Sequence, residues 1–373
     1  MRKKIAALVL LISTALGLCS CATIDQLKQN VQKDISAYQS EEGQDGTVDT
    51  SNVSIDETNY YYSQLKTETE RKTYMEIYSI LLNKDDMAFV SIEDMDNLEF
   101  LYYCVMYDYP ELFYVDGYSY SQYQNNSISF MPKYTMNETE IDAAMQTIEG
   151  YKQSVLSQMT EEMSSYDKEK IIYDYISANT EYVEGSPYNQ SMYSVALGQS
   201  VCLGYSKMFQ YLCKQCQIPC TIVTGNIKEG TAHGWNCVNI NGNWYMTDVT
   251  NSTIAVDEKE KQKSYYLFNV TEQEIRRYYS IDNAVAIPPC NRMDENYYYK
   301  NGVYFDTADI DRFGQLKEAS ETKDILIKCS TQAVLDEICH QLIDEEQVYS
   351  ILDTNHVSYM VSDDTLTFEV TWD

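Results

Sequence analysis

Histidine and basic residues are scarce in this chain of 373 residues, and long apolar runs are confined to its start. There are 3 histidines, and of these only His233 lies close in sequence to a plausible nucleophile. Lysine and arginine number 27 against 57 aspartate and glutamate residues. Such an acidic surface repels phosphate backbones, which excludes nucleic acid as a partner. The interior of the chain holds no internal repeat and no run that is long and apolar enough to span a membrane.

The first residues have the pattern of an export signal. Residues 1–21, MRKKIAALVLLISTALGLCSC, join a basic start to an apolar run too short for a comfortable span and then to small residues. The ending Leu18-Cys19-Ser20-Cys21 resembles a bacterial lipobox, which implies cleavage before Cys21 and lipidation of its thiol. An ordinary signal peptide or a signal anchor is the alternative. We expect a signal peptide over 1–20 and a protein that is lipid-anchored to the outer face of the bacterial cell membrane.

Composition and periodicity divide the rest of the chain into four regions. Residues 21–58 would hold the anchor and a flexible tether, because the stretch from about Ser40 to Glu57 has almost no apolar residues and cannot offset its own ordering entropy. Helical periodicity and an alternating pattern that breaks at Asn125-Asn126 predict a helical and hairpin region over 59–165. A catalytic core is expected over 166–290. A small C-terminal α/β module follows over 291–373, with strands at 324–329, 357–362 and 365–372 and a helix at 331–343.

Cys202 stands where a helical pattern begins. Apolar residues follow it at helical spacing, so Cys202 is expected in or just before the first helical turn. The amides and the positive dipole end at a helix start favour a thiolate and can hold a developing oxyanion. Gly204 would keep the approach beside this nucleophile open. The alternative, a small apolar residue on the buried side of a helix, describes Cys213 and Cys216 better.

A tight hairpin is expected to carry the base. Asn241-Gly242 is the strongest short hairpin signal, and it separates runs of strand character at 233–240 and 243–250. With those two residues as the turn, Asp248 faces Trp235 and His233 lies diagonally on the same side, within reach of a carboxylate. A shift by one residue would put the pair on opposite faces. The turn thus predicts that base and orienter lie together.

These three residues form a candidate Cys-His-Asp triad. His233 would take the thiol proton of Cys202, and Asp248 would hold the imidazole tautomer and stabilise its charged form. The alternative is a core histidine that is hydrogen-bonded to Thr250 or to the backbone. Order, spacing and register together favour the triad.

The central motifs resemble those of the bacterial transglutaminase-like superfamily. They are Val201-Cys202-Leu203-Gly204-Tyr205-Ser206-Lys207, Ile218-Pro219-Cys220 with Gly225, His233-Gly234-Trp235-Asn236, Trp244-Tyr245 and Asp248-Val249-Thr250. The resemblance implies an α+β, papain-related core in which a nucleophile helix packs on an antiparallel sheet. By position it implies Cys202 as nucleophile, His233 as base and Asp248 as third member, and it makes Tyr193 and Trp235 candidates for oxyanion or substrate contacts. Gln217 replaces a common glycine, which predicts an altered helix end.

The remaining cysteines and histidines have weaker interpretations. Cys213, Cys216 and Cys220 have spacings that could bind zinc, but no further ligand at matching spacing completes a site, so no metal and no organic cofactor is expected. A Cys216–Cys220 or a Cys220–Cys237 disulfide is compatible with export. His340 and His356 lack motif context and are expected to be ordinary surface or packing residues.

The predicted function is a membrane-anchored cysteine peptidase or amidase. Cys202 would form a thioester with a protein or cell-wall peptide substrate and pass the acyl group to water. Amine transfer, as in a protein-glutamine transglutaminase, is the close alternative. A non-catalytic adhesion or scaffold module of the same fold is the other, although it would have no need of an intact Cys, His and Asp. The sequence does not predict the oligomeric state.

Overall fold

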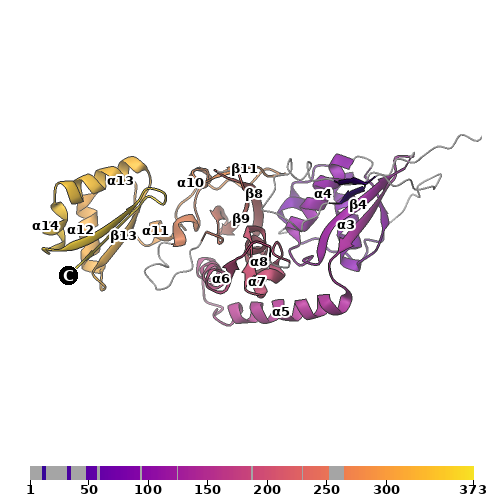
Figure 1. Cartoon of the computed structure of the whole chain (residues 1–373), viewed down its shortest axis with the longest axis horizontal. Coiled ribbons are helices and arrows are strands. Elements are labelled where there is room, and N and C mark those ends of the chain that lie inside the picture. Colours follow the sequence, from indigo (N-terminus) through magenta and orange to yellow (C-terminus); the bar gives the residue numbers. More distant parts are fainter. Residues whose placement is uncertain are drawn as a thin grey trace, which may run out of the picture. The chain divides into compact units, whose positions relative to one another are not determined.

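The computed structural model describes residues 48–56, 59–92, 95–123, 125–185, 188–228, 230–251 and 264–373, together with the backbone of 11–13 and 32–34 (Figure 1). Cleavage and lipidation at Cys21 and most of the predicted tether lie outside these residues. The chain forms two compact units. Unit 1 comprises Met1–Asn251 and Thr271–Asn291, and unit 2 comprises Ser252–Val270 and Arg292–Asp373. Among the described residues, no helix has both the length and the apolar character that crossing a bilayer requires.

Unit 1 begins with helices and a three-stranded sheet of order β3-β5-β4. The predicted hairpin is β4 and β5, with Asn126 in the left-handed region at φ 64°. Capping boxes start α3 and α5, at Thr67 and Asn137. The elements are β1 (Leu11–Ser13), β2 (Gln32–Asp34), α2 (Tyr60–Ser63), α3 (Glu68–Asn83), β3 (Ala88–Val90), α4 (Met95–Asp108), β4 (Val115–Gln122), β5 (Ile128–Tyr134) and α5 (Glu138–Leu156).

The second half of unit 1 is an antiparallel sheet of order β10-β9-β8-β11, with α8 packed against β8 and β9 (Figure 1). The short strands β6 and β7 pair in parallel beside it. The elements are α6 (Ser165–Asn179), β6 (Glu181–Tyr182), α7 (Met192–Ala196), β7 (Gln199–Ser200), α8 (Cys202–Gln215), β8 (Cys220–Ile227), β9 (Ala232–Ile240), β10 (Asn243–Thr247), α10 (Glu272–Ile275) and β11 (Tyr279–Ile281).

The β9–β10 hairpin has the predicted turn and the predicted register. Asn241 and Gly242 have φ values of 54° and 86°, which is the pair of left-handed residues that a type I′ turn needs. Asn243 lies opposite Ile240, and the pairing continues in step along both strands. Because this register fixes which side chains share a face, it places Asp248 and His233 on one side of the hairpin.

The end of α8 differs from the prediction made for Gln217. The expected altered helix end is absent, because Gln217 itself takes the left-handed conformation, with φ 59°, that glycine would supply. The amide of Ile218 then donates to the carbonyl oxygen of Cys213 at 2.9 Å, which closes the helix. A non-glycine residue in this region of backbone space carries conformational strain, and the hydrogen bond and the burial of Ile218 offset it.

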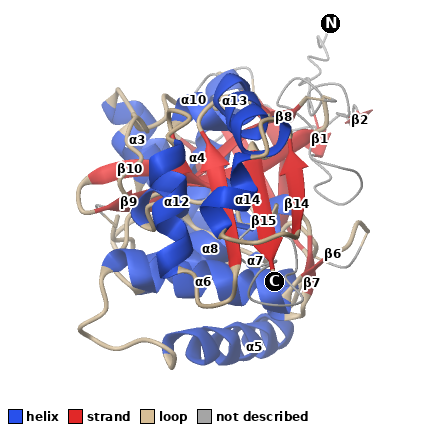
Figure 2. Ribbon diagram, turned by 90° about the vertical axis from the view of Figure 1, so that its left-hand side faces the viewer, coloured by secondary structure: helices blue, strands red, loops and turns tan. Residues whose placement is uncertain are grey.

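Unit 2 is a mixed sheet of order β12-β13-β15-β14 with helices on one face. Figure 2 shows α12, α13 and α14 in front of β14 and β15. Phe368 and Val370 of β15 are buried in its core, and Trp372 is half-buried against it, as the alternating pattern predicts. The elements are η1 (Ser264–Leu267), α11 (Tyr297–Lys300), β12 (Tyr304–Phe305), α12 (Ile310–Ala319), β13 (Asp324–Cys329), α13 (Gln332–Cys339), η2 (His340–Asp344), α14 (Gln347–Leu352), β14 (Val357–Ser362) and β15 (Thr367–Trp372).

Candidate active site

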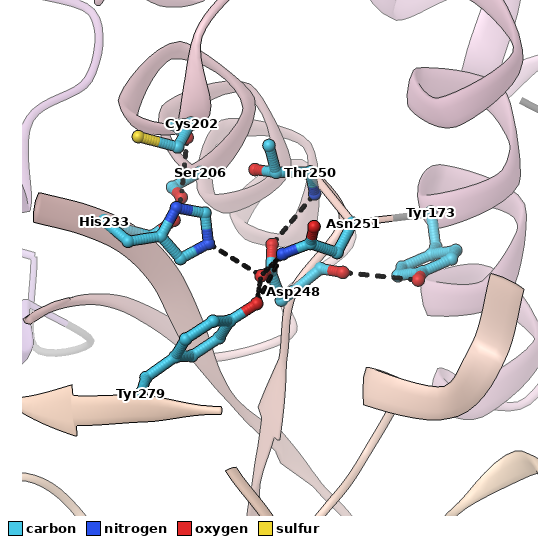
Figure 3. A network of polar contacts seen from close by, with 9 residues as sticks. Tyr173, Cys202, Ser206, His233, Asp248, Thr250, Asn251 and Tyr279 are labelled. Atoms are coloured by element: carbon cyan, nitrogen blue, oxygen red, sulfur yellow. Dashed lines mark hydrogen bonds and ion pairs between the residues drawn. The ribbon is translucent and has the colours of Figure 1, made fainter. Parts of the chain in front are cut away.

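His233 and Asp248 are in direct contact at the open end of the β9–β10 hairpin. Nε2 of His233 lies 2.7 Å from Oδ2 of Asp248 (Figure 3). Asp248 is fully buried and His233 is 8% exposed, so little water competes for this hydrogen bond. With Nε2 engaged by the carboxylate, the tautomer that donates to Asp248 leaves Nδ1 as the ring's proton acceptor.

Four further groups hold Asp248. The hydroxyl of Tyr279 donates to Oδ2 at 2.6 Å, and the side-chain amide of Asn251 donates to the same oxygen at 2.9 Å. The backbone amide of Thr250 donates to Oδ1 at 2.9 Å, and the hydroxyl of Tyr173 donates to the main-chain oxygen at 3.3 Å. Asn251 also donates to the hydroxyl of Tyr279. Both carboxylate oxygens therefore have partners, which fixes the plane of the group that orients His233 (Figure 3).

These contacts keep the carboxylate of Asp248 ionised. Burial on its own would raise the pKa of Asp248, because a charge is poorly solvated inside the protein. The charge of His233 and the hydrogen bonds from His233, Tyr279 and Asn251 outweigh that effect and hold the pKa below its ordinary value. A negative group behind the ring stabilises the imidazolium that forms when His233 takes a proton.

Cys202 is the first residue of α8, and this helix begins without a side-chain cap. The helices α3, α5, α6 and α12 each start at a residue whose side chain accepts a first-turn amide. The N-cap of α8 is Val201, which has no side-chain oxygen, and among the described residues no side-chain cap bond is made there. The positive end of the helix dipole therefore acts on Cys202 and on any oxyanion formed beside it.

The contacts of α8 with the sheet place Cys202 toward the end of β9 that carries His233. The side-chain oxygen of Ser206 lies 2.9 Å from the carbonyl oxygen of Gly234, and the side chain of Gln210 donates to the carbonyl of Cys220, which is paired with Val238. The helix thus runs along β9 in the same direction. Cys202 lies one turn before Ser206 in α8, toward the start of β9, where His233 lies.

Figure 3 shows the Cys202 side chain above the His233 ring, on the opposite side from Asp248. The ring nitrogen left for the thiol, Nδ1, faces upward toward the start of α8. Cys202 has no exposed surface. A substrate therefore reaches the sulfur only after neighbouring residues move.

Gly204 has a structural role that differs from the prediction. Its ideal Cβ would lie 2.0 Å from the side-chain oxygen of Ser200 and 2.9 Å from the carbonyl oxygens of Asn189 and Ser191. The glycine therefore allows α8 to approach the residues on both sides of α7, and it does not keep an approach for substrate open. Gly204 fixes the height of the first turn of α8, and with it the position of Cys202.

The two candidates for substrate contact have other surroundings. Trp235 is fully buried, with its ring centroid 6.0 Å from that of His233 and 5.0 Å from that of Tyr279. The ring of Trp235 packs against the imidazole of His233, and its role in a substrate contact stays a prediction. Tyr193 lies in the short helix α7, half-buried, with its ring 5.8 Å from that of Phe113 and 5.6 Å from that of Tyr188. Its role at an oxyanion stays a prediction.

The cysteines and histidines outside the triad are placed as follows. Among the described residues, no group of three or more His, Cys, Asp or Glu side chains could hold a metal ion. The sulfur of Cys216 contacts that of Met159 at 3.6 Å, whereas Cys213 is hydrogen-bonded to Cys220. His340 is an exposed residue with Asp344 at 3.3 Å, and His356 is also exposed.

The family model of the transglutaminase-like superfamily matches residues 152–249, which include the candidate triad. The α+β core of unit 1 is accordingly transglutaminase-like, and the predicted fold class is confirmed. No curated protein matches the chain.

Three solved structures are similar to parts of the chain. A protein described as a TGase shares 16% identity over 39% of this chain and 46% of its own, with a TM-score of 0.28. A proposed cysteine protease from Cytophaga hutchinsonii shares 15% over 36% of this chain and 61% of its own, with a TM-score of 0.25. A proposed protease from Parabacteroides distasonis shares 10% over 34% and 29%, with a TM-score of 0.20. This chain thus spans less than two thirds of the length of each.

Proposed function

We propose that this protein is an exported, lipid-anchored cysteine peptidase or amidase that works through Cys202, His233 and Asp248. One observation carries the proposal: the 2.7 Å contact between Nε2 of His233 and Oδ2 of Asp248, inside a buried cluster at the start of β9. A histidine held in this way presents its other nitrogen as a base. The uncapped start of α8 supplies the second half of the argument, since it favours a thiolate at Cys202.

The reaction proceeds through a thioester. Nδ1 of His233 takes the thiol proton, and the sulfur of Cys202 attacks the amide carbonyl of the substrate. The oxyanion that forms is stabilised at the helix start. His233 then returns the proton to the leaving amine, which departs as the carbon–nitrogen bond breaks. A water molecule, deprotonated by the same ring, attacks the thioester and releases the acid together with the thiol of Cys202.

Alkylation with iodoacetamide near neutral pH, followed by peptide mass spectrometry, tests the nucleophile. Cys202 is fully buried, whereas Cys216 and Cys339 are partly exposed. Exposure alone would therefore label Cys216 and Cys339 first. An activated thiolate reverses that order, so we expect Cys202 to react at least tenfold faster than either, and His233→Ala to remove the advantage. Because burial of Cys202 is the same in both proteins, labelling of Cys202 at the same rate in the wild type and in His233→Ala would contradict the proposal and favour a non-catalytic module.

The final acceptor distinguishes a hydrolase from a transglutaminase. The match to the transglutaminase-like superfamily makes amine transfer the second candidate. A glutaminyl peptide is incubated with and without a primary amine, and the products are weighed. We expect deamidation or cleavage to dominate in both mixtures. If amine incorporation is faster than hydrolysis, the protein is a transferase and not a hydrolase. Both activities require the same nucleophile, so Cys202→Ala should lose both products in either case.

The anchor is tested separately on growing bacteria. A fatty acid that carries an alkyne group should label the wild-type protein, and Cys21→Ala should stay unlabelled and leave the membrane fraction. Equal labelling of the two proteins would contradict lipidation at Cys21 and would leave the proposed catalytic activity unaffected.

A further inference from the structure

Two buried thiols outside the candidate active site are in contact with each other inside unit 1. Cys237 lies in β9, and Cys290 lies nine residues after the end of β11. Their sulfur atoms are 3.6 Å apart, although 53 positions separate the residues in the chain. Both side chains are buried. A disulfide bond is about 2.05 Å long, so the two sulfurs need to approach by about 1.5 Å before the bond can form.

The register of the sheet decides which cysteines can pair with Cys237. Cys220 lies opposite Val238, and Cys237 lies opposite Thr221. Residues opposite each other share a face, so Cys220 and Cys237 point to opposite faces of the sheet. The Cys220–Cys237 disulfide considered from the sequence is therefore excluded in this fold. On the face that Cys237 occupies, Cys290 is the thiol that contacts it.

The surroundings of Cys237 and Cys290 disfavour a charged thiolate. Burial raises the pKa of Cys237 well above its ordinary value, and the neighbouring Cys290 adds to that rise. Tyr60 lies beside both sulfurs, donates its hydroxyl to the carbonyl oxygen of Ala286 at 2.8 Å and contacts the ring of Trp244. The thiol of Cys290 also donates to the carbonyl oxygen of Pro288 at 3.4 Å, and a disulfide would give up this weak hydrogen bond while leaving no group that can ionise in the buried site.

We propose that Cys237 and Cys290 form a structural disulfide when the chain folds in the presence of a disulfide oxidant. The oxidant, a small-molecule or protein disulfide, accepts two electrons and two protons. The two sulfur–hydrogen bonds break, one sulfur–sulfur bond forms, and the oxidant leaves as two thiols. The proposal does not depend on catalysis by Cys202.

The bond would enclose the segment that completes the candidate active site. The loop between Cys237 and Cys290 contains Asp248, Asn251 and Tyr279. Its far end is already held by the amide of Glu272, which donates to the carbonyl oxygen of Cys290 at 2.7 Å. A covalent link between β9 and Cys290 limits how far this loop can spread when the protein unfolds, and the stabilisation grows with loop length.

The test is refolding of the reduced, unfolded protein in a mixture of reduced and oxidised glutathione. The remaining thiols are then alkylated in denaturant, and the digest is searched for a linked peptide pair. We expect a Cys237–Cys290 pair, and a fall in Tm of about 10 °C when the bond is reduced. The proposal is wrong if both cysteines are recovered alkylated, or if either is linked to a different cysteine.

Two variants distinguish the effect of the disulfide bond on Tm from the effect of replacing a cysteine side chain. Cys290→Ser should lack the linked pair and should have the same Tm with and without reductant. Cys216→Ser serves as the matched control, because the sulfur of Cys216 contacts Met159 and lies apart from this pair. It should keep both the linked peptides and the full response to reductant. A Tm for Cys290→Ser that still falls on reduction would contradict the proposal.

Discussion

Among its described residues, unit 1 contains two fully buried aspartates with several hydrogen-bond donors of the same kind, Asp248 and Asp108. Each accepts a tyrosine hydroxyl, from Tyr279 at 2.6 Å and from Tyr74 at 2.7 Å. Each also accepts backbone amides. The pKa values of the two carboxyl groups are nevertheless shifted in opposite directions. The pKa of Asp248 lies below its ordinary value, whereas burial raises the pKa of Asp108 to about 6.

The difference comes from where the cation binds. His233 touches the carboxylate of Asp248 directly. Lys214 donates instead to the main-chain oxygen of Asp108 at 2.5 Å and to Asn59 at 2.8 Å, so its charge lies farther from the carboxylate. A buried, hydrogen-bonded aspartate is therefore not evidence of catalysis by itself. What makes Asp248 the candidate is its partner, because an imidazole such as that of His233 can take up and release a proton near neutral pH and the phenol of Tyr74 cannot.

The largest expected contrast is in activity. Asp248→Asn should lower turnover of the glutaminyl peptide by about a thousandfold or more, because an amide neither fixes the imidazole tautomer nor balances its charge. Asp108→Asn should stay within about threefold of the wild type. Steady-state kinetics measure both, with circular dichroism to show that each variant is folded. Equal losses in the two variants would make Asp248 a structural residue like Asp108.

The next contrast is in the dependence of stability on pH. A carboxyl with a raised pKa in the folded state binds its proton more tightly there, so its stabilising effect is present at low pH and is lost as the pH rises through about 6. The stability of the wild type relative to Asp108→Asn should therefore rise by about 2 kcal/mol between pH 7 and pH 4. Asp248→Asn should show the reverse trend at lower pH, since a carboxyl whose pKa is held below its ordinary value of 3.8 keeps its stabilising effect down to about pH 4 and loses it on further acidification.

Urea titrations at pH 7 and pH 4 measure the difference for Asp108→Asn, and titrations extended to about pH 2 measure the one for Asp248→Asn. Parallel curves for the wild type and Asp108→Asn would contradict the assignment of a raised pKa to Asp108.

The smallest contrast is between the two tyrosines. Tyr279→Phe should lower turnover about tenfold, because Asp248 loses one of its charge-assisted hydrogen bonds and keeps the others. Tyr74→Phe should cost about 1–3 kcal/mol in the free energy of unfolding and leave turnover unchanged. Kinetics and urea unfolding of the two variants give both numbers. A loss of turnover in Tyr74→Phe that matches the loss in Tyr279→Phe would show that stability alone explains the effect.

The pairing of His233 with Asp248 could be predicted because it is a local property. Asn241-Gly242 selects one turn type, the turn selects one register, and the register puts the two side chains together. The helical start at Cys202 is equally local, since the spacing of apolar residues after it indicates the helix. The fold of unit 2 follows similar patterns, and β13 and β14 have the predicted bounds.

What could not be predicted depends on contacts between distant segments. Tyr279 follows Asp248 by 31 positions and carries no motif, so its bond to the carboxylate appears only when β11 pairs with β8. The Cys237–Cys290 contact has the same origin. The bond from Asn251 could have been predicted, because Asn251 is only three residues after Asp248 and its side-chain amide can donate to a carboxylate at that distance along the chain.

The close approach at Gly204 has a consequence for mutational scanning. Three oxygen atoms occupy the space that any larger side chain at this position would need. In a library selected for enzyme activity, nearly every substitution of Gly204 would score as badly as replacement of the nucleophile two positions earlier. Such a map would mark a residue without a reactive atom as part of the chemistry. Only a parallel score for protein abundance would separate a displaced backbone from a missing sulfur.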